Sequence, residues 1–354
     1  MSKVFEGLKV VELASVLAGP AVGMFFAELG AEVIKVENKL AGGDVTRTWR
    51  LANEQSGDAR SAYYCSVNYG KKVLMYNLKD QKDRNKLNEL LKDADIVLSN
   101  FRPRVADKLD LTYEHVKAIN TRVIFAELKG YPDSDRPAYD VVLQAETGFM
   151  HMTGEKERVP VKMPVALIDL LAAHQLKEGI LVALIRKLKT GEGALVKVNL
   201  FDSALASLAN QATNWLVAKH IPQAMGSAHP NIAPYGDVFE GRDGRYFVLA
   251  VGSDTHFKGL CNSIGQASLA RDPLFKSNPD RLKNRTKLIN HLATIFKEKA
   301  AEEWLSILEE HQVPAGLIRN MKEVFELDIA REKILHYSDN DALKAVQSVA
   351  FEVY

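Results

Sequence analysis

Short runs rich in β-branched residues alternate with helical patterns along the N-terminal part of the chain, and this alternation restricts the fold more than any other feature. The runs lie at 8–14, 32–37, 72–78, 95–99 and 122–128. Helical patterns lie between them at about 20–29, 82–92 and 112–119. Strands that alternate with helices predict an α/β fold, with a doubly wound and mostly parallel sheet that is covered by helices.

The residues that follow these strands are candidates for ligand binding. Ligands of such sheets bind beyond the carboxyl ends of the strands. The segments at these ends are 15–19, 37–38, 100–102 and 129–130. The strand pattern alone therefore predicts where a site would lie.

The second half of the chain predicts a further division. A helical stretch over about 166–189 is apolar nearly all round and is expected to be buried. The segment 218–235 holds three prolines and is typical of a linker. Beyond it, Asp243-Gly244 between two β patterns predicts a hairpin. We expect a large domain over 1–220, a smaller α+β domain over 226–320, and a segment over 321–354 that returns toward the large domain.

Composition excludes several classes of protein. The chain has 354 residues, of which 47% are hydrophobic and 26% charged, and its net charge is +1. This balance provides no field for nucleic acid or a membrane surface. The N-terminus lacks a signal-peptide core, and the most apolar run, 13–27, is too short to span a bilayer. Cys65 and Cys261 form no disulfide or metal pattern, so we expect a cytoplasmic protein without a metal.

The segment after the first predicted strand can be compared with the sequence pattern of a dinucleotide-binding site. A strand, a glycine-containing turn, a helix and a second strand ending at Glu37 follow one another as in a Rossmann fold. The glycine fingerprint is absent, because Ala21 and Met24 occupy the second and third glycine positions after Gly19. The pattern disfavours classical NAD or FAD binding, and the alternative is a Gly-Pro turn that only begins a helix.

The stretch "PVALIDLLAAH" places Asp169 among apolar neighbours. One interpretation is a helix cap or a first-turn acid, which the helix dipole would stabilise. The other is a reactive carboxylate. An ordinary aspartate pKa of about 3.9 would leave it ionised at neutral pH, whereas burial would oppose the charge.

Several segments in order resemble the family III CoA-transferases, a superfamily that includes formyl-CoA transferase, carnitine CoA-transferase and α-methylacyl-CoA racemase. The first is "LKVVELASVLAGPAVGMFFAELGAEVIKVE", followed by "GGDVTR". The others are "SVNYGKKVLMYNLK", "ADIVLSNFRPRVADKL", "PAYDVVLQAETGFMHMTG", "HPNIAPYGDVFEGRDGRYFVLAVG" and "HQVPAGLIRNMKEVF". Together they cover nearly the whole chain.

The resemblance implies a Rossmann-like large domain that binds CoA, a small domain, and two chains interlinked as a homodimer. It implies that Asp169 attacks the thioester of an acyl-CoA and forms an aspartyl-acyl anhydride, which passes on to a second carboxylic acid. Acyl-CoA would be a substrate, and no metal or permanently bound cofactor would be needed.

The resemblance also implies which residues meet the CoA moiety and the thioester. The candidates from the first turn, the second and third motifs and the following loop are Val16, Leu17, Ala18, Lys71, Asn100, Phe101, Arg104, Lys108, Tyr139 and Asp140. Cations suit the phosphates of CoA.

Two alternatives to the transferase stay open. In the racemases the position of Tyr139 holds a proton-moving histidine, and tyrosine is a poor base near neutral pH; Asp254, near another racemase acid, keeps a 2-methylacyl-CoA racemase or epimerase open. The linker has only Gly226 where formyl-CoA transferases carry a glycine run, and Leu17 replaces a glutamine. The chain also stops at Tyr354, without the family's longer tail. These departures leave a non-catalytic CoA-binding homologue as the second alternative.

Overall fold

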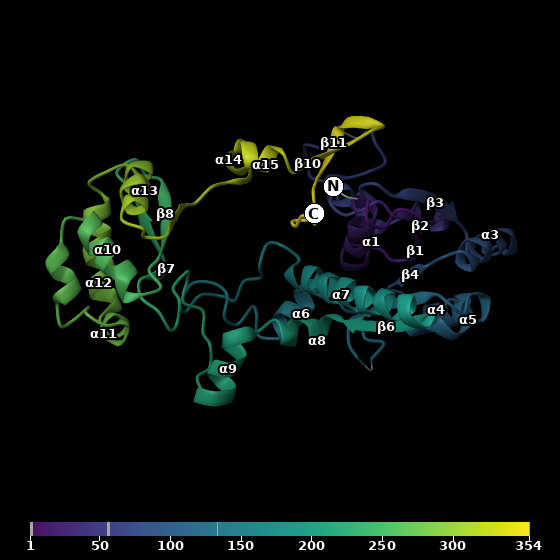
Figure 1. The fold of residues 1–354 in the computed structure, drawn as a ribbon, viewed down its shortest axis with the longest axis horizontal. Helices are drawn as coiled ribbons and strands as arrows, with labels where there is room; N and C mark the ends of the chain where they lie inside the picture. Colours follow the sequence, from purple (N-terminus) through teal and green to yellow (C-terminus); the bar gives the residue numbers. More distant parts are fainter. Residues whose placement is uncertain (1–2, 55–56, 133, 354) are drawn as a thin grey trace. The chain divides into compact units, whose positions relative to one another are not determined.

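Contacts divide the chain into two units in the computed structural model, which describes residues 3–54, 57–132 and 134–353 (Figure 1). The first unit comprises Met1–Met150, Lys162–Pro222 and Arg331–Tyr354, and the second comprises His151–Val161 and Gln223–Ala330. The main division along the chain falls near residue 222, and the expected large domain ends at 220. The sequence did not predict that 151–161 would join the second unit, or that the returning segment would begin at 331 rather than 321.

A six-stranded parallel sheet forms the centre of the first unit, which confirms the α/β expectation. The strand order is β3-β2-β1-β4-β5-β6. The strands are β1 Lys9–Glu12, β2 Glu32–Asn38, β3 Lys72–Tyr76, β4 Ile96–Ser99, β5 Ile124–Lys129 and β6 Ala194–Asn199. The order reverses between β1 and β4, and a sheet of this kind opens a crevice for ligands at that point.

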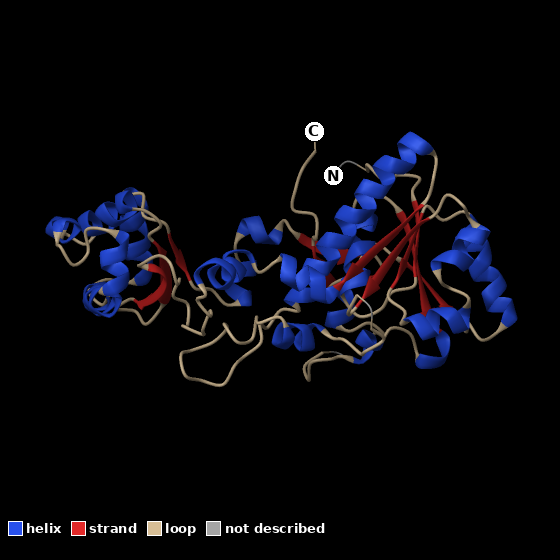
Figure 2. Ribbon diagram, turned by 90° about the horizontal axis from the view of Figure 1, so that it is seen from below, coloured by secondary structure: helices blue, strands red, loops and turns tan. Residues whose placement is uncertain are grey.

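Helices cover both faces of this sheet (Figure 2). The helices of the first unit are α1 Ala18–Glu28, α2 Ala62–Cys65, α3 Gln81–Lys92, α4 Pro103–Leu109, α5 Tyr113–Ile119, α6 Asp140–Glu146, α7 Leu167–Thr190, α8 Leu200–Ala206 and α9 Ala209–Ala218. Neighbouring strand residues point to opposite faces. Val10 therefore packs with α1 and α7, and Val11 packs with Leu87 and Leu91 of α3.

The long helix α7 departs from the sequence expectation on one side. Ile168, Leu176 and Ile180 are buried in the core with α1, as its apolar character predicts. Ile185 and Leu188, however, are 55% and 86% exposed. Apolar residues therefore occupy more of the α7 surface than the rest of this unit covers.

The second unit has a small antiparallel sheet and its own core. The sheet contains β7 Tyr235–Glu240, β8 Tyr246–Ala250 and β9 Ala315–Leu317. The helices are α10 Asp254–Ser263, α11 Asn278–Lys283, α12 Arg285–Phe296, α13 Ala301–Glu310, α14 Met321–Phe325 and α15 Asp328–Arg331, which crosses the boundary. Gly244 has a φ of +78° in the turn between β7 and β8, as the hairpin prediction requires.

The C-terminal segment packs on the first unit. It forms a hairpin of β10 Ile334–Tyr337 and β11 Asn340–Val346. The Tyr337 hydroxyl donates to the carbonyl of Cys65 at 3.1 Å. Further along, the Glu28 carboxylate accepts bonds from the amides of Ser348 and Val349.

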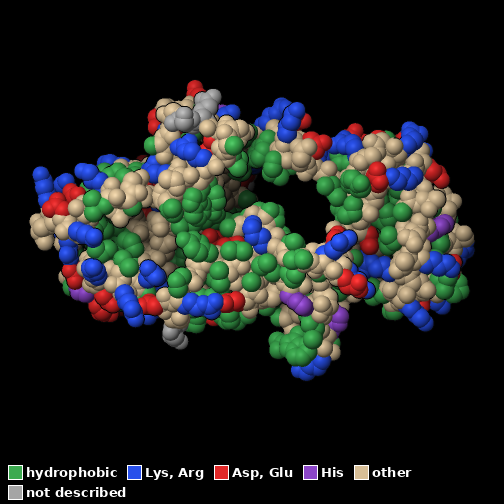
Figure 3. Space-filling view, turned by 180° about the vertical axis from the view of Figure 1, so that it is seen from behind, with side chains coloured by type: hydrophobic (Ala, Val, Ile, Leu, Met, Phe, Trp, Pro, Cys, Tyr) green, Lys and Arg blue, Asp and Glu red, His purple; other side chains and the backbone are tan. Residues whose placement is uncertain are grey.

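Surface charge follows the composition. Basic and acidic side chains are intermixed over the face in Figure 3. Within 3–54, 57–132 and 134–353, no helix has the length and apolar character needed to cross a bilayer. The same residues contain no group of three or more His, Cys, Asp or Glu arranged to hold a metal ion.

Candidate active site at the strand ends

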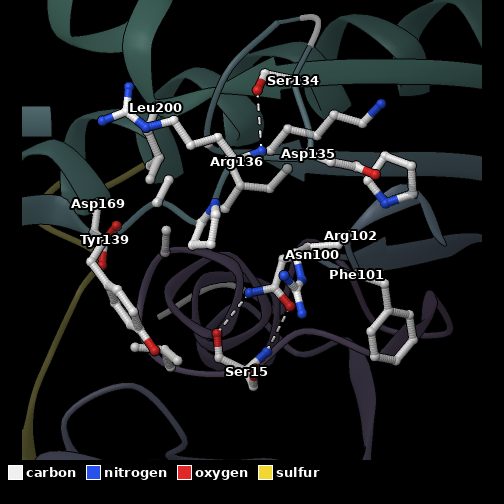
Figure 4. Close-up of a pocket in the computed structure, with 18 of the residues that line it drawn as sticks. Ser15, Asn100, Phe101, Arg102, Ser134, Asp135, Arg136, Tyr139, Asp169 and Leu200 are labelled. Atoms are coloured by element: carbon white, nitrogen blue, oxygen red, sulfur yellow. Dashed lines mark hydrogen bonds between the residues drawn. The ribbon is translucent and has the colours of Figure 1, made fainter. Parts of the chain in front are cut away.

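The turn between β1 and α1 is held by contacts to its backbone. The Asn100 side chain pairs with both backbone groups of Ser15, accepting from the amide at 3.1 Å and donating to the carbonyl at 2.9 Å (Figure 4). The Asp44 carboxylate accepts from the Val16 amide at 3.2 Å. Val16 has a φ of +75°, which a β-branched residue rarely adopts. The surrounding side chains therefore impose an unusual backbone on this turn.

The start of α1 leaves backbone donors free. Leu17 and Ala18 are buried, and their amides have no hydrogen-bond partner in the part of the chain that the structure describes. Gly19 allows the helix to lie close to the segment after β1, since a Cβ there would be 2.4 Å from that of Ala14. The first turn can thus present its amides to an oxygen atom of a ligand.

Asp169 is the third residue of α7 and is not the cap of that helix. The capping acceptor comes from a different helix. Asp140, at the start of α6, accepts from the amides of Ile168 at 2.7 Å and Asp169 at 3.4 Å. Gln144 donates to the other Asp140 oxygen at 2.6 Å and accepts from the Met163 amide at 2.8 Å. Asp140 therefore satisfies the helix end, and the Asp169 side chain is available for another role.

The carboxylate of Asp169 lies in an environment that opposes its charge. Burial, followed by the neighbouring charge of Asp140, raises its pKa to about 7. Among the described residues, no side chain or amide donates a hydrogen bond to it. This differs from the ordinary value expected from the sequence, because desolvation outweighs the helix dipole.

Asp169 and the residues from Ser15 to Ala18 line one cavity of about 450 Å³. Figure 4 shows Asp169 and Tyr139 together on one side, with Asn100 and Ser15 across the opening from them. The lining residues are Ser15, Val16, Leu17, Ala18, Asn100, Phe101, Arg102, Pro103, Leu128, Lys129, Gly130, Ser134, Asp135, Arg136, Pro137, Ala138, Tyr139, Asp169 and Leu200. The cavity lies at the ends of β1, β4 and β5, where the strand pattern predicts a site.

The structure brings seven of the predicted site residues to this cavity. They are Val16, Leu17, Ala18, Asn100, Phe101, Tyr139 and Asp169. Asp140, the first residue of α6, is not among the lining residues, and its carboxylate accepts from the amide of Ile168 in the first turn of α7. Arg104 and Lys108 are exposed on α4, and Arg104 pairs at 3.3 Å with Asp135 of the cavity wall.

Lys71 is not placed where a CoA phosphate could reach it. Its side chain has no exposed surface and lies 2.7 Å from the Glu12 carboxylate. It also donates to the carbonyl of Pro20 at 2.8 Å and to Asn68 at 3.0 Å. Burial lowers the pKa of Lys71 to about 7 despite the charge of Glu12. The sequence suggested a surface cation because a partner 59 residues away is not visible in a linear pattern.

Two residues near the site were not predicted. Burial, and then the charge of Asp169, raises the pKa of Tyr63 to about 12. Arg136 lines the cavity, pairs with Glu146 and lies over the Tyr131 ring at 5.0 Å. Tyr63 lies on the short helix α2, outside the strand ends, and no local signal marked it.

Asp254, the residue that kept the racemase interpretation open, is in an ion pair. Its carboxylate accepts from Arg281 at 2.7 Å within the second unit. The Arg281 guanidinium also lies 4.5 Å from the centre of the Phe257 ring. This carboxylate therefore already has a structural partner.

The parallel sheet, with a cavity at its strand ends that Asp169 lines, defines an α/β protein with a candidate ligand site. Comparison with known proteins is more specific. The sequence model of the protein family described as CoA-transferase family III matches residues 5–353. The chain belongs to that family, as the sequence motifs indicate, and is an enzyme of the CoA-transferase class.

Similar proteins cover most of the chain. The succinyl-CoA:glutarate CoA-transferase of Homo sapiens is 37% identical over 94% of this chain and 75% of the relative. The acetyl-CoA:oxalate CoA-transferase of Acetobacter aceti is 37% identical over 91% of this chain and 82% of the relative. A crystal structure of a CAIB/BAIF family protein from Brucella suis has a TM-score of 0.86 and 36% identity, with 99% and 93% of the two chains covered.

Proposed function

We propose that this enzyme transfers CoA between an acyl-CoA and a carboxylic acid through an anhydride on Asp169. The observation that carries the proposal is the Asp169 carboxylate itself, which lies in the cavity without a hydrogen-bond donor from the described residues. A carboxylate that is poorly solvated is a stronger nucleophile than one in water. An anhydride also retains the activation of a thioester.

The steps balance without an oxidant or a metal. An Asp169 oxygen attacks the thioester carbonyl, the C–S bond breaks, and CoA leaves as a thiolate. The thiolate attacks the aspartyl carbonyl of the anhydride, which releases the first acid and leaves CoA on Asp169. The acceptor carboxylate attacks this thioester and forms a second anhydride. The thiolate then attacks its acyl carbon, which releases the new acyl-CoA and restores Asp169.

The start of α1 suits the acyl oxygen in these steps. The amides of Leu17 and Ala18 are donors at the same cavity as Asp169. Donors fixed before the reaction stabilise the negative charge that develops on a carbonyl oxygen. We assign Tyr139 to the neighbourhood of the thioester because it lines the cavity, and we add Tyr63 because burial and then the charge of Asp169 raise its pKa.

The remaining cavity residues suit CoA. Asn100, Phe101 and Val16 form the wall at the strand ends. Arg102 supplies positive charge there, whereas Lys129 is paired with Glu127 at 3.2 Å. We assign Arg104 and Lys108 to the phosphates, as exposed cations on the adjoining helix α4. We assign Lys71 no contact with CoA, because its side chain is buried.

The acids exchanged are proposed to be short dicarboxylates. The printed names of the similar human and Acetobacter enzymes include succinyl-CoA, glutarate and oxalate. The cavity includes Arg136, which pairs with Glu146 and could meet a second substrate carboxylate by exchanging or sharing that partner. A panel with succinyl-CoA as donor should give higher kcat/KM with glutarate or oxalate than with acetate. Equal rates with acetate would contradict this substrate class.

The anhydride is tested by trapping during turnover. Hydroxylamine or borohydride should modify Asp169, and mass spectrometry of the peptide should locate the change. Asp169→Ala should abolish transfer and trapping, whereas Asp83→Asn, which alters a first-turn acid of α3, should keep both. Full transfer by Asp169→Ala would refute the mechanism. Deuterium exchange at the α-carbon without an acceptor acid would instead identify a racemase, and CoA binding without turnover would identify a non-catalytic homologue.

We further propose that two chains form a homodimer. Apolar side chains are exposed on two helices of the first unit, Val182, Ile185 and Leu188 of α7 and Trp215, Leu216 and Val217 of α9. Exposed apolar groups of this size commonly mark interfaces. Light scattering should give twice the chain mass, and Leu188→Glu with Val217→Glu should lower it. A monomeric wild-type protein would refute the dimer.

A cytoplasmic location is also kept as a proposal. Both cysteines, Cys65 and Cys261, are buried free thiols, as a reducing compartment allows. Fractionation of cells that express the chain tests this, and recovery from another compartment would contradict it.

A further inference from the structure

Three consecutive residues before α1 are held by three different side chains. Lys35 of β2 donates to the Ala14 carbonyl at 2.8 Å. Asn100 pairs with Ser15, and Asp44 accepts from the Val16 amide at 3.2 Å. All of these hydrogen bonds join the turn to side chains that lie outside it. The path of the turn is therefore set by residues that come from β2, from the segment after β2 and from the end of β4.

These side-chain contacts matter most at Val16, because its φ of +75° is unusual for valine. A left-handed φ is unfavourable for a β-branched residue and persists only where the surroundings impose it. Asp44 supplies the hydrogen-bond acceptor at this residue, and its own side chain is fully buried. Thr46 orients Asp44 by donating its amide and its hydroxyl to one carboxylate oxygen, at 3.1 and 2.8 Å.

A row of alternating buried charges supports Asp44. Lys35 lies 3.1 Å from Asp44 and 2.8 Å from Glu12, and Lys71 lies 2.7 Å from Glu12. All four side chains are at most 1% exposed. Burial raises the pKa of Asp44, but the charge of Lys35 and the donors of Thr46 outweigh it, and the net pKa is lowered. Asp44 therefore stays ionised and continues to accept the hydrogen bond from the Val16 amide.

The same row of charges holds the start of α1. Glu12 approaches Gly23 so closely that a Cβ there would be 1.8 Å from its Oε2 atom. Lys71 reaches the Pro20 carbonyl in the first turn of α1. The helix whose free amides line the cavity is thus fixed to the sheet by the same buried ion cluster that fixes the turn before it.

We propose that Asp44 is a positioning residue for acyl-CoA binding. It holds Val16 in the left-handed conformation, and this conformation turns the amides of Leu17 and Ala18 toward the cavity. Asp44 itself does not touch the substrate. The inference deepens the proposed function and rests on it for the identity of the ligand, although CoA binding can be measured without any Asp169 chemistry.

Glycine at position 16 provides the decisive test, because glycine adopts a positive φ without the penalty that valine has. Four proteins are compared: wild type, Asp44→Asn, Val16→Gly and the double variant. Asp44→Asn is expected to weaken CoA binding in calorimetry, and to raise the KM for acyl-CoA, by roughly tenfold. In the Val16→Gly background the same substitution is expected to cost less than about threefold.

Two further variants separate positioning from loss of folding. Thr46→Val removes one donor to Asp44 and should weaken CoA binding in the same direction, by a few-fold, even if Asp44→Asn does not fold. Asp237→Asn breaks a comparable ion pair with Arg285 at 2.8 Å in the second unit, and should leave CoA binding unchanged. Circular dichroism confirms folding of each protein.

Equal effects of Asp44→Asn in the valine and glycine backgrounds would overturn the proposal, as would unchanged CoA binding in a folded Asp44→Asn protein. If trapping of Asp169 fails while the CoA-binding differences remain, the proposed anhydride is wrong and the positioning role stands. If wild type does not bind CoA, both the proposed function and the positioning role of Asp44 in acyl-CoA binding are refuted.

Discussion

The Asp140 carboxylate caps the helix that carries Asp169, and its negative charge adds to burial in raising the Asp169 pKa to about 7. One carboxylate thus positions the other and also makes it harder to ionise. This relationship predicts both the pH dependence of the enzyme and the stability of its variants.

The first prediction concerns activity against pH. Attack requires ionised Asp169, so kcat/KM should rise with pH with a midpoint near 7, because this parameter reports the free enzyme. Asp140→Asn should move the midpoint to lower pH by removing the charge, while burial keeps it above the ordinary value. An unchanged midpoint in a folded Asp140→Asn protein would show that the two carboxylates are not coupled.

The second prediction concerns stability. The folded state holds a proton on Asp169 more tightly than the unfolded chain, whose aspartate pKa is about 3.9. The free energy of unfolding from this group is therefore highest below pH 4 and falls as pH rises toward 7. Asp169→Asn should raise Tm at pH 8, by about 2–4 °C, and change it much less at pH 4.5. A lower Tm at pH 8 would contradict the burial of a charge at this site.

The third prediction concerns packing between α1 and β1. Gly23→Ala places a methyl group where the Glu12 carboxylate lies, and the ion cluster or the helix must shift. Tm should fall by an amount equivalent to about 1–3 kcal/mol or more. Gly57→Ala is the control, since no heavy atom of the described residues lies within 4 Å of the added Cβ. Similar melting of the two variants would argue against a tight contact at Gly23.

The fourth prediction separates function from general stability with two asparagines. Asn100→Ala removes the clamp on Ser15 and should weaken CoA binding by about tenfold, since two hydrogen bonds to the turn are lost. Asn120→Ala removes a similar clamp on the carbonyls of Leu91 and Ala94 beside the other face of the sheet. It should lower Tm and leave CoA affinity within twofold. Equal losses of affinity would mean that Asn100 acts only through stability.

Much of the site followed from local pattern. The strand at 95–99 predicted that Asn100 and Phe101 would lie at a sheet edge, and both line the cavity. Period-two alternation and strand ends are properties of a few neighbouring residues, so a linear sequence displays them. The resemblance to the family added Asp169, which no periodicity could distinguish from an ordinary first-turn acid.

Other features depended on distant parts of the chain. The charge of Asp169 contributes to the raised pKa of Tyr63 on α2, and Asp140 caps a helix that begins 27 residues later. The exposure of the apolar residues Ile185 and Leu188 of α7 could not be predicted from the sequence either. A hydrophobic pattern indicates that a surface can be covered, whereas only the packed structure shows which parts are covered by this chain.

The sequence by itself determined the order of strands and helices, the α/β class and the end of the sheet where the site lies, because these follow from short-range backbone and side-chain preferences. The tertiary structure decided the charge and partner of each ionisable group. Lys71 and Glu12 are 59 residues apart, and only the parallel packing of β1, β2 and β3 with α1 brings them together away from water. Desolvation and pairing depend on that packing, so the pKa of Asp169 and the placement of Lys71 could not be obtained from the order of residues alone.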